Sequence, residues 1–345
     1  MEKTALFGKT LDQLKEITDQ LDLPSFNAQQ IAAWLYQKDI NSFDKMTNIS
    51  KKARIMLNEH FDFGVYPHMN MQISKDGTKK YLFNTGKYQY IESAYIPENN
   101  RSTLCISSQV GCKMGCLFCM TGKQGYQANL SSGDILNQVR SLPERKQLSN
   151  IVYMGMGEPF DNIEAVLKSV EILTSEWGFN ISPRRVTVST IGIIPAMRTF
   201  IEESNAHLAI SLQTPFEEER QQIMPIEKVY PIKEVINVLK SYDLNKQRRI
   251  SFEYIMFDGF NDTSRHVNEL ARLLNGLRCR INLIRFHPIP GRPLKGSDDG
   301  SIMSFMERLK AKGIINTLRK SRGIDIDAAC GLLSTKEKSV QQLKS

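Results

Sequence analysis

Hydrophobic positions divide the chain into regions of different spacing. Up to about residue 62, apolar residues such as Leu14 and Ile17 recur at helical intervals, and Ser50 stands where it can cap a last helix. The pattern predicts a small N-terminal helical accessory domain over residues 1–65.

Residues 66–98 carry shorter apolar runs of the kind found in strands. The dipeptide Asp76-Gly77 separates two of these runs, and dipeptides of this type form turns. We therefore expect a β-hairpin or meander here, acting as a small β linker to the region that follows.

From residue 103 onward, strand and helix patterns alternate. Six apolar runs predict strands, and helical spacing returns between them. The strands are predicted at 103–109, 150–156, 185–191, 206–212, 249–257 and 279–286, and the helices at 132–141, 161–175, 195–204, 231–241, 263–275 and 301–312. Such alternation is typical of an α/β fold with a parallel sheet.

Six strand–helix units are two short of a closed eight-fold barrel. The pattern therefore allows a partial (β/α)6 barrel or a doubly wound sheet, and spacing alone does not separate the two. We assign residues 99–335 to this core and residues 336–345 to a polar tail.

Composition narrows the class of protein. The chain has 345 residues, 41% of them hydrophobic and 24% charged, as in ordinary soluble globular proteins. Its first residues hold no long apolar segment, so we expect neither a signal peptide nor a membrane span. The excess of 45 Lys and Arg over 37 Asp and Glu fits nucleic-acid binding as well as general solubility.

Three of the six cysteines, Cys112, Cys116 and Cys119, form a C-x3-C-x2-C run. Crowded cysteines in a chain of this length favour a reducing cytoplasm over a secreted disulfide framework. Three thiolates can hold three irons of a four-iron cluster and leave the fourth iron open to a small molecule. A structural zinc site and a disulfide pair are the alternatives, although zinc wants four ligands and the nearest histidines are distant in sequence.

Unusual residues gather where the predicted strands end. In parallel α/β folds, ligands bind at the carboxyl ends of the strands, so a shared position there predicts a cofactor pocket. Glycines allow close approach of the backbone, and an acidic side chain can accept a hydrogen bond from an amine. The residues concerned are Gly157, Glu158, Ser189, Ser211, Leu212, Gln213 and His287.

The remaining cysteines differ in their surroundings. Cys279 and, by residue type alone, Cys105 are expected to be small buried hydrophobes within strands. Cys330 lies between small residues in an Ala-Ala-Cys-Gly segment, which leaves its sulfur accessible to an approaching molecule.

Taken together, these segments resemble the RlmN/Cfr family of radical S-adenosylmethionine (SAM) RNA methyltransferases. The matching segments are CISSQVGCKMGCLFC at 105–119, MGMGEP at 154–159, SPRRVTVSTIGIIPA at 182–196, ISL at 210–212, MPI at 224–226 and GIDIDAACG at 323–331. The resemblance implies a radical SAM partial barrel and is greater to the RlmN branch, which methylates C2 of adenosine, than to the C8-methylating Cfr branch.

The same resemblance implies one [4Fe-4S] cluster on the three-cysteine run and two molecules of SAM per turnover. Cys330 would take a methyl group from the first SAM, and reduction of the second SAM at the cluster would produce the radical that activates this methyl group. Glu92 would remove the ring proton, although by residue type it is a solvated strand residue. Cys105 would release the product by forming a disulfide with Cys330.

The implied substrates are 23S rRNA, at the peptidyl transferase centre, and tRNA, at the adenosine next to the anticodon. The implied reductant is an external, flavodoxin-like electron donor. Candidate phosphate contacts are Arg184, Arg185, Lys246 to Arg249, Arg319, Lys320 and Arg322, each of which also fits a solvated surface.

Two positions depart from the family pattern, because Gln213 stands where the family has His and His287 stands where it has Asn. Both side chains can still form hydrogen bonds, so SAM binding is expected to persist. Two other functions remain open: a C8 methyltransferase, and a non-catalytic RNA-binding module with a structural metal.

Overall fold

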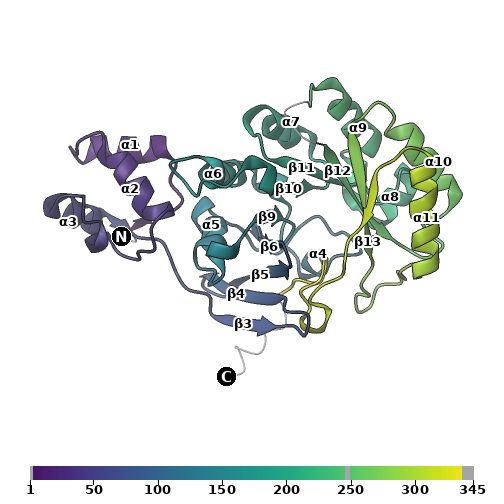
Figure 1. Cartoon of the computed structure of the whole chain (residues 1–345), viewed down its shortest axis with the longest axis horizontal. Helices are drawn as coiled ribbons and strands as arrows, with labels where there is room; N and C mark the ends of the chain where they lie inside the picture. The colour runs from purple at the N-terminus through teal and green to yellow at the C-terminus, as the bar shows by residue number, and fades with distance from the viewer. Residues whose placement is uncertain (1–2, 245–248, 336–345) are drawn as a thin grey trace.

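The computed structural model describes residues 3–244 and 249–335 (Figure 1). The predicted polar tail, 336–345, and the candidate RNA contacts at 246–248 lie outside these residues. Within them the chain forms one large open sheet, helices outside it, and a helical unit at the N-terminal end.

Seven parallel strands make up most of the ten-stranded sheet. They are β6 (Arg101–Cys105), β9 (Asn150–Tyr153), β10 (Val186–Thr190), β11 (His207–Ser211), β12 (Ile250–Met256), β13 (Cys279–Arg285) and β14 (Asn316–Leu318). Neighbours in the sheet are also neighbours in this chain order. A doubly wound sheet reverses its strand order at a switch point, so the continuous order identifies the partial barrel. All six predicted strands are confirmed, and β14 adds a seventh.

Three antiparallel strands extend the sheet beyond β6. They are β3 (Asn70–Ile73), β4 (Lys79–Gly86) and β5 (Gln89–Glu98), the strands predicted as a linker. The two edges, β3 and β14, are not paired with each other in the described part of the chain, so the sheet is not closed.

Helices follow most of the parallel strands and cover the outer face of the sheet (Figure 1). They are α5 (Ser132–Arg140), α6 (Ile163–Thr174), α7 (Ile194–Glu203), α8 (Glu217–Ile223), α9 (Ile232–Ser241), α10 (Ser264–Leu273) and α11 (Asp299–Ala311). The short helix α4 (Met120–Gln124) lies instead at the cavity, where Thr121 is a lining residue. Alternate residues of each strand, such as Leu104 on β6 and Leu283 on β13, join the helices in the main hydrophobic core. The intervening residues face the inside of the barrel.

A separate helical unit precedes the sheet. It contains β1 (Thr4–Ala5), α1 (Leu11–Gln20), α2 (Asn27–Tyr36), α3 (Lys51–His60) and β2 (Phe61–Asp62). Ser50 caps α3 by accepting a hydrogen bond from the Ala53 N–H, as the sequence predicted. The unit packs on α5, where the Arg140 guanidinium donates to the carbonyl oxygens of Lys38 and Ile40.

The helices of the described segments are too short or too polar to span a lipid bilayer.

Candidate functional site

A cavity of about 680 Å³ lies against the inner face of the sheet. Alternation along the strands brings Thr103 and Cys105 of β6, and Asn282 and Ile284 of β13, to its wall. Four of the predicted site residues share this cavity: Cys105, Cys119, His287 and Cys330.

The three-cysteine run forms a loop between β7 (Gln109–Val110) and α4. Gly111 opens the loop with a φ of +74°, and a Cβ at this position would lie 1.7 Å from the Gly125 carbonyl oxygen, so only glycine fits. The Cys112 N–H donates to the same oxygen at 3.2 Å. The backbone at Gly125 therefore fixes the start of the loop at Gly111 and Cys112.

The thiols of this loop are close enough to influence one another. Burial, and then the charge of Cys119, raises the pKa of Cys112 to about 12. Burial also raises the pKa of Cys116, and the other two cysteines add to the effect. A bound cation would reverse these shifts, because metal coordination stabilises thiolates.

Three cysteines at this spacing in the sequence fit a four-iron cluster. In the described part of the chain, no three His, Cys, Asp or Glu side chains converge on one metal-ion position. Around a four-iron cluster each cysteine binds a different iron, so the sulfurs stand further apart than around a single zinc ion. Cys112, Cys116 and Cys119 are the residues that would hold such a cluster.

The segment that carries Cys330 is hydrogen-bonded to the start of α4 and packs against the end of the cysteine loop. The Met120 N–H donates to the Gly331 carbonyl oxygen at 2.7 Å, and Thr121 Oγ1 donates to the Leu333 carbonyl oxygen at 2.7 Å. Gly331 has a φ of +85°, and a Cβ there would lie 2.8 Å from the Phe118 carbonyl oxygen. These contacts bring Cys330 to the same end of the cavity as Cys119.

Cys105 and Cys330 are near neighbours, and neither forms a disulfide. Burial, and then the charge of Cys330, raises the pKa of Cys105 to about 12. Burial within the cavity also raises the pKa of Cys330, although this side chain is accessible from the cavity space. The prediction that Cys330 bares its sulfur is confirmed, and Cys279 is half-buried against the core.

Arg319 lines the same cavity as these two thiols and lies near both. Its guanidinium donates to Glu253 Oε1 at 2.9 Å and to Met154 Sδ at 3.3 Å, and its positive charge opposes the pKa rise of both Cys105 and Cys330. The sequence pointed to Arg319 only as a phosphate contact. Glu253 was missed, although an acid inside the apolar run of β12 was a usable signal.

Glu92 is fully buried, so its interpretation as a solvated strand residue is wrong. Its Oε1 lies 3.4 Å from Lys80 Nζ, and its Oε2 accepts from the Ser334 N–H at 3.2 Å. Glu92 lies on the same face of β5 as Ala94, which pairs with Cys105 on β6. The burial comes from the neighbouring strand and from the segment that follows Cys330.

Gly157 and Glu158 are held mainly by protein atoms. A Cβ on Gly157, whose φ is +98°, would lie 2.5 Å from the Gln109 Cβ, so close packing of two loops requires the glycine. The Glu158 carboxylate accepts from the N–H groups of Phe160 and Ile191 and from the Thr190 hydroxyl. Burial raises the pKa of Glu158 to about 7, with these hydrogen bonds opposing the rise.

A buried arginine that the sequence did not single out fixes the ends of β10 and β11. Arg220 donates to the carbonyl oxygens of Ile191, Ser211 and Leu212 and forms a buried ion pair with Glu227. Of the predicted cofactor residues at these strand ends, Leu212 and Ser189 are buried and Ser211 is half-buried.

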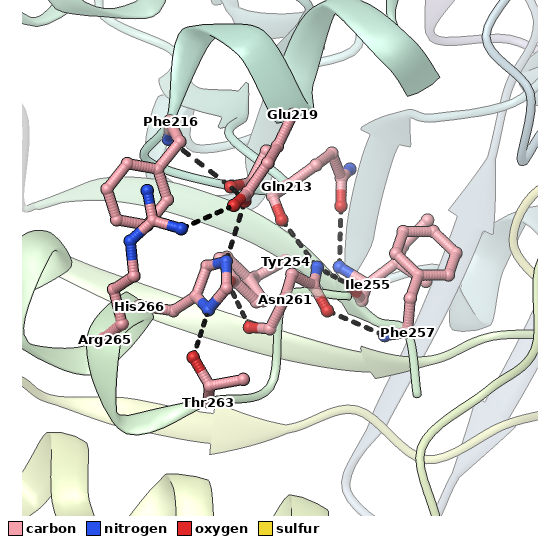
Figure 2. A network of polar contacts seen from close by, with 11 residues as sticks. Gln213, Phe216, Glu219, Tyr254, Ile255, Phe257, Asn261, Thr263, Arg265 and His266 are labelled. Atoms are coloured by element: carbon pink, nitrogen blue, oxygen red, sulfur yellow. Dashed lines mark hydrogen bonds and ion pairs between the residues drawn. The ribbon is translucent and has the colours of Figure 1, made fainter. Parts of the chain in front are cut away.

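Gln213 is part of a polar network at the end of β11 (Figure 2). It has a φ of +63°, its side-chain oxygen accepts from the Ile255 N–H at 2.6 Å, and its carbonyl oxygen accepts from Asn261 at 2.6 Å. Beside this group, His266 lies between Glu219 and Thr263 and bonds to both. The structure thus gives the Gln213 oxygen a protein partner at this strand end.

His287 lines the cavity, and burial, with the nearby charge of Arg285, lowers its pKa. Among the candidate RNA contacts, those at the cavity wall are Arg184, Arg249, Arg319, Lys320 and Arg322. Arg185 is exposed outside the cavity.

A partial barrel with a three-cysteine loop at one end of its cavity defines the radical SAM class of enzymes. The family model of the radical SAM superfamily matches residues 106–274, and that of the ribosomal RNA large subunit methyltransferase N-terminal domain matches residues 4–62. A crystal structure of a radical SAM methyltransferase from Sphaerobacter thermophilus is similar, with a TM-score of 0.88 and 40% identity over 96% of this chain and 99% of that one.

Curated relatives define the family more closely. A probable dual-specificity RNA methyltransferase RlmN from Phocaeicola vulgatus is 52% identical over 98% of both chains. A dual-specificity RNA methyltransferase RlmN from Nitratiruptor is 41% identical over 95% of this chain and 98% of its own. This chain belongs to the RlmN family of radical SAM RNA methyltransferases.

Proposed function

We propose that the protein transfers a methyl group from SAM to C2 of an adenosine in 23S rRNA and of the adenosine 3′ of the anticodon in some tRNAs. One observation carries this proposal: Cys105, Cys119 and Cys330 open into a single cavity. A methyl-accepting thiol, a release thiol and a cluster ligand are the groups that this reaction must bring together.

The chain's residues divide the work. Cys330 accepts the methyl group of one SAM as a thiolate, which is the nucleophilic form of cysteine. The [4Fe-4S] cluster, when bound to Cys112, Cys116 and Cys119, supplies the electron that activates a second SAM. C2 of adenine is electron-poor and resists polar methylation. The methyl carbon is therefore first bound to the Cys330 sulfur and is activated there before it bonds to C2.

Two further groups complete the turnover. Glu92, held by Lys80 and by the Ser334 N–H, takes the proton from the ring carbon. Cys105 then attacks the Cys330 sulfur, the bond between that sulfur and the methylene carbon breaks, and this carbon takes a proton to become the methyl group. The products are a Cys105–Cys330 disulfide and the methylated base, and the one electron left over would return to the cluster that Cys112, Cys116 and Cys119 would hold. An external flavodoxin-like donor in a reducing cytoplasm would restore the electrons.

Strand-end residues hold SAM. The loop at Gly157 and Glu158, which the Glu158 carboxylate ties to Thr190 and Ile191, meets the amino group of SAM, and the backbone at Ser189, Ser211 and Leu212 forms the rest of the binding surface. Gln213 acts by fixing the turn after β11, and His287 faces the cavity.

The RNA base enters through the open side of the sheet. Basic side chains on the cavity wall, Arg184, Arg249, Lys320 and Arg322, meet the phosphates on either side of the extruded adenosine. The base itself lies against Cys330.

Identification of the methyladenosine isomer tests the proposal. Ribosomal RNA and tRNA would be separated from cells with and without the protein, digested and analysed by mass spectrometry against isomer standards. We expect 2-methyladenosine in both fractions only when the protein is present. Finding 8-methyladenosine alone would assign the C8 reaction instead.

Two variants test the thiol roles. Cys330→Ala should abolish methylation while SAM is still cleaved under reducing conditions. Cys105→Ser should leave RNA covalently attached to the protein, visible as a nuclease-sensitive band on a denaturing gel. Methylated RNA from the Cys330→Ala protein would exclude a cysteine-bound methyl group.

A further inference from the structure

A chain of hydrogen bonds between polar side chains leads to Arg319 on the cavity wall. Thr317 Oγ1 donates to Asn282 Oδ1 at 2.8 Å, and Asn282 Nδ2 donates to Glu253 Oε1 at 2.8 Å. The same carboxylate oxygen accepts from Arg319 Nη2 at 2.9 Å. Three strands, β12, β13 and β14, therefore contribute to holding the Arg319 guanidinium in place.

The guanidinium has a second anchor. Its Nη1 contacts Met154 Sδ at 3.3 Å, and its backbone N–H donates to the Leu283 carbonyl oxygen at 2.8 Å. The Arg319 side chain is thereby held in the lining that it shares with Cys105 and Cys330. Burial by itself lowers the pKa of Arg319, but Glu253 and the two thiolates raise it above its ordinary value, so the side chain stays charged.

The thiolate of Cys330 requires a positive charge nearby. Burial makes its thiolate unfavourable, and the Glu253 carboxylate adds to this effect, whereas Arg319 opposes it through its charge and a hydrogen bond. The other titratable or charged residues that line the cavity are Glu98, Arg101, Cys105, Cys119, Arg184, His207, Arg249, Arg280, His287, Lys320 and Arg322. Arg319 is held in this lining by hydrogen bonds to Glu253 and Met154.

We propose that Arg319, oriented by Glu253, stabilises the thiolate of Cys330 and thereby makes this residue a methyl acceptor. The inference rests on the proposed function. The thiol proton leaves to water in the cavity, the sulfur lone pair forms a bond to the methyl carbon of SAM, and the carbon–sulfonium bond breaks. Its electron pair stays on the sulfur of S-adenosylhomocysteine. Once methylated, Cys330 is a neutral thioether, and Arg319 is no longer required.

The pH dependence of Cys330 alkylation tests this role without requiring RNA or methyl transfer. The anaerobic, cluster-loaded protein would be treated with iodoacetamide, and peptide mass spectrometry would follow the unmodified fraction of Cys330. Contact with an arginine shifts the titration of an acidic group by about 1–3 pH units. We expect Arg319→Gln to move the alkylation midpoint upward by at least about one unit, which slows the reaction about tenfold at pH 7.

Two further variants separate charge from packing. Arg319→Lys keeps the positive charge and should keep most of the reactivity of Cys330. Arg101→Gln is the matched control, because Arg101 lines the same cavity but pairs with Glu98, and its alkylation midpoint should equal that of the unsubstituted protein. An unchanged midpoint in folded Arg319→Gln overturns the inference.

The unsubstituted protein provides a test that no folding defect can obscure. Burial raises the pKa of Cys279 to about 11, opposed by the charge of Lys240, whereas at Cys330 Arg319 opposes the rise in pKa through both its charge and a hydrogen bond. Cys330 should therefore be alkylated with a lower midpoint than Cys279. Equal midpoints would overturn the inference.

The last measurement follows methyl transfer to Cys330 itself. SAM with a deuterated methyl group is added without reductant, and the labelled Cys330 peptide is quantified. We expect labelling in the unsubstituted protein and at least a tenfold slower rate in Arg319→Gln. No label on Cys330 in the unsubstituted protein, together with a shifted alkylation midpoint, would contradict the proposed function and leave the role of Arg319 supported. Labelling at equal rates in both proteins would overturn the role of Arg319.

Discussion

Replacement of Arg220 by Met should strongly destabilise the protein. The Arg220 side chain is fully buried, and its ion-pair partner Glu227 is only 3% exposed. Burial lowers the pKa of Arg220 and raises that of Glu227, so each charge depends on the other. Removing one partner of a buried pair costs about 3–5 kcal/mol, because the other charge remains buried without compensation.

The carbonyl oxygens add to this cost. Arg220 donates to Ile191 at 2.7 Å, Ser211 at 2.9 Å and Leu212 at 3.1 Å, and Met offers no donor in their place. Unsatisfied buried groups cost about 1–3 kcal/mol each, although some relaxation is expected. We therefore take about 4 kcal/mol as the lower bound. At about 2 °C per kcal/mol for a protein of this size class, the melting temperature should fall by about 8 °C or more.

Thermal unfolding followed by circular dichroism measures this change. Arg272→Met on α10 is the matched control, because Arg272 is 68% exposed and its pairing with Glu269 is screened by water, so no measurable shift is expected. The double variant Arg220→Met with Glu227→Met should recover part of the loss, since both charges are then absent. Equal melting temperatures for Arg220→Met and the control would refute the reasoning.

Two other predictions concern the loop and the segment around the cavity. Gly111→Ala places a Cβ against the Gly125 carbonyl oxygen, so iron content after cluster reconstitution should fall at least several-fold, whereas Gly276→Ala, with open space around its Cβ, should load normally. Acid should loosen the segment that carries Cys330, because hydrogen bonds from Thr78 and Gly323 lower the pKa of Asp76 to about 2, against the opposing effect of burial. A lowered folded-state pKa stabilises the segment above about pH 4 and loses this effect toward pH 2. The protection factor of the Ala328 amide, which corrects for the intrinsic pH dependence of exchange, should fall over this window, and Asp76→Asn should show low protection at every pH; a protection factor that does not depend on pH in the unsubstituted protein would contradict the assignment.

The six parallel strands were predictable because each is a long apolar run, buried on one face by helices. β14 was not, because its three residues are too short to show a period. The antiparallel strands were predicted as a linker, but their joining to the main sheet was not. Pairing of β5 with β6 depends on contacts across the sheet and not on the pattern within either strand.

Individual site residues show the same limit. The cysteines and the strand-end residues were found because their types and spacing carry chemistry. Glu92 was misjudged because its partner Ser334 lies 242 residues away in the chain. Arg220 follows Glu217, Glu218 and Glu219, so it was indistinguishable from a solvated helix face until the fold buried it.

The packing of the Cys330 segment against the cysteine loop also affects the order in which the site is assembled. The bond from Thr121 to Leu333 joins positions 212 residues apart, so during synthesis the loop emerges long before the thiol that packs on it. Metal insertion can therefore take place on a loop that the later thiol does not yet cover. Cys330 therefore cannot compete for metal at the loop until the rest of the barrel has been synthesised, whereas Cys105 precedes the loop in the chain.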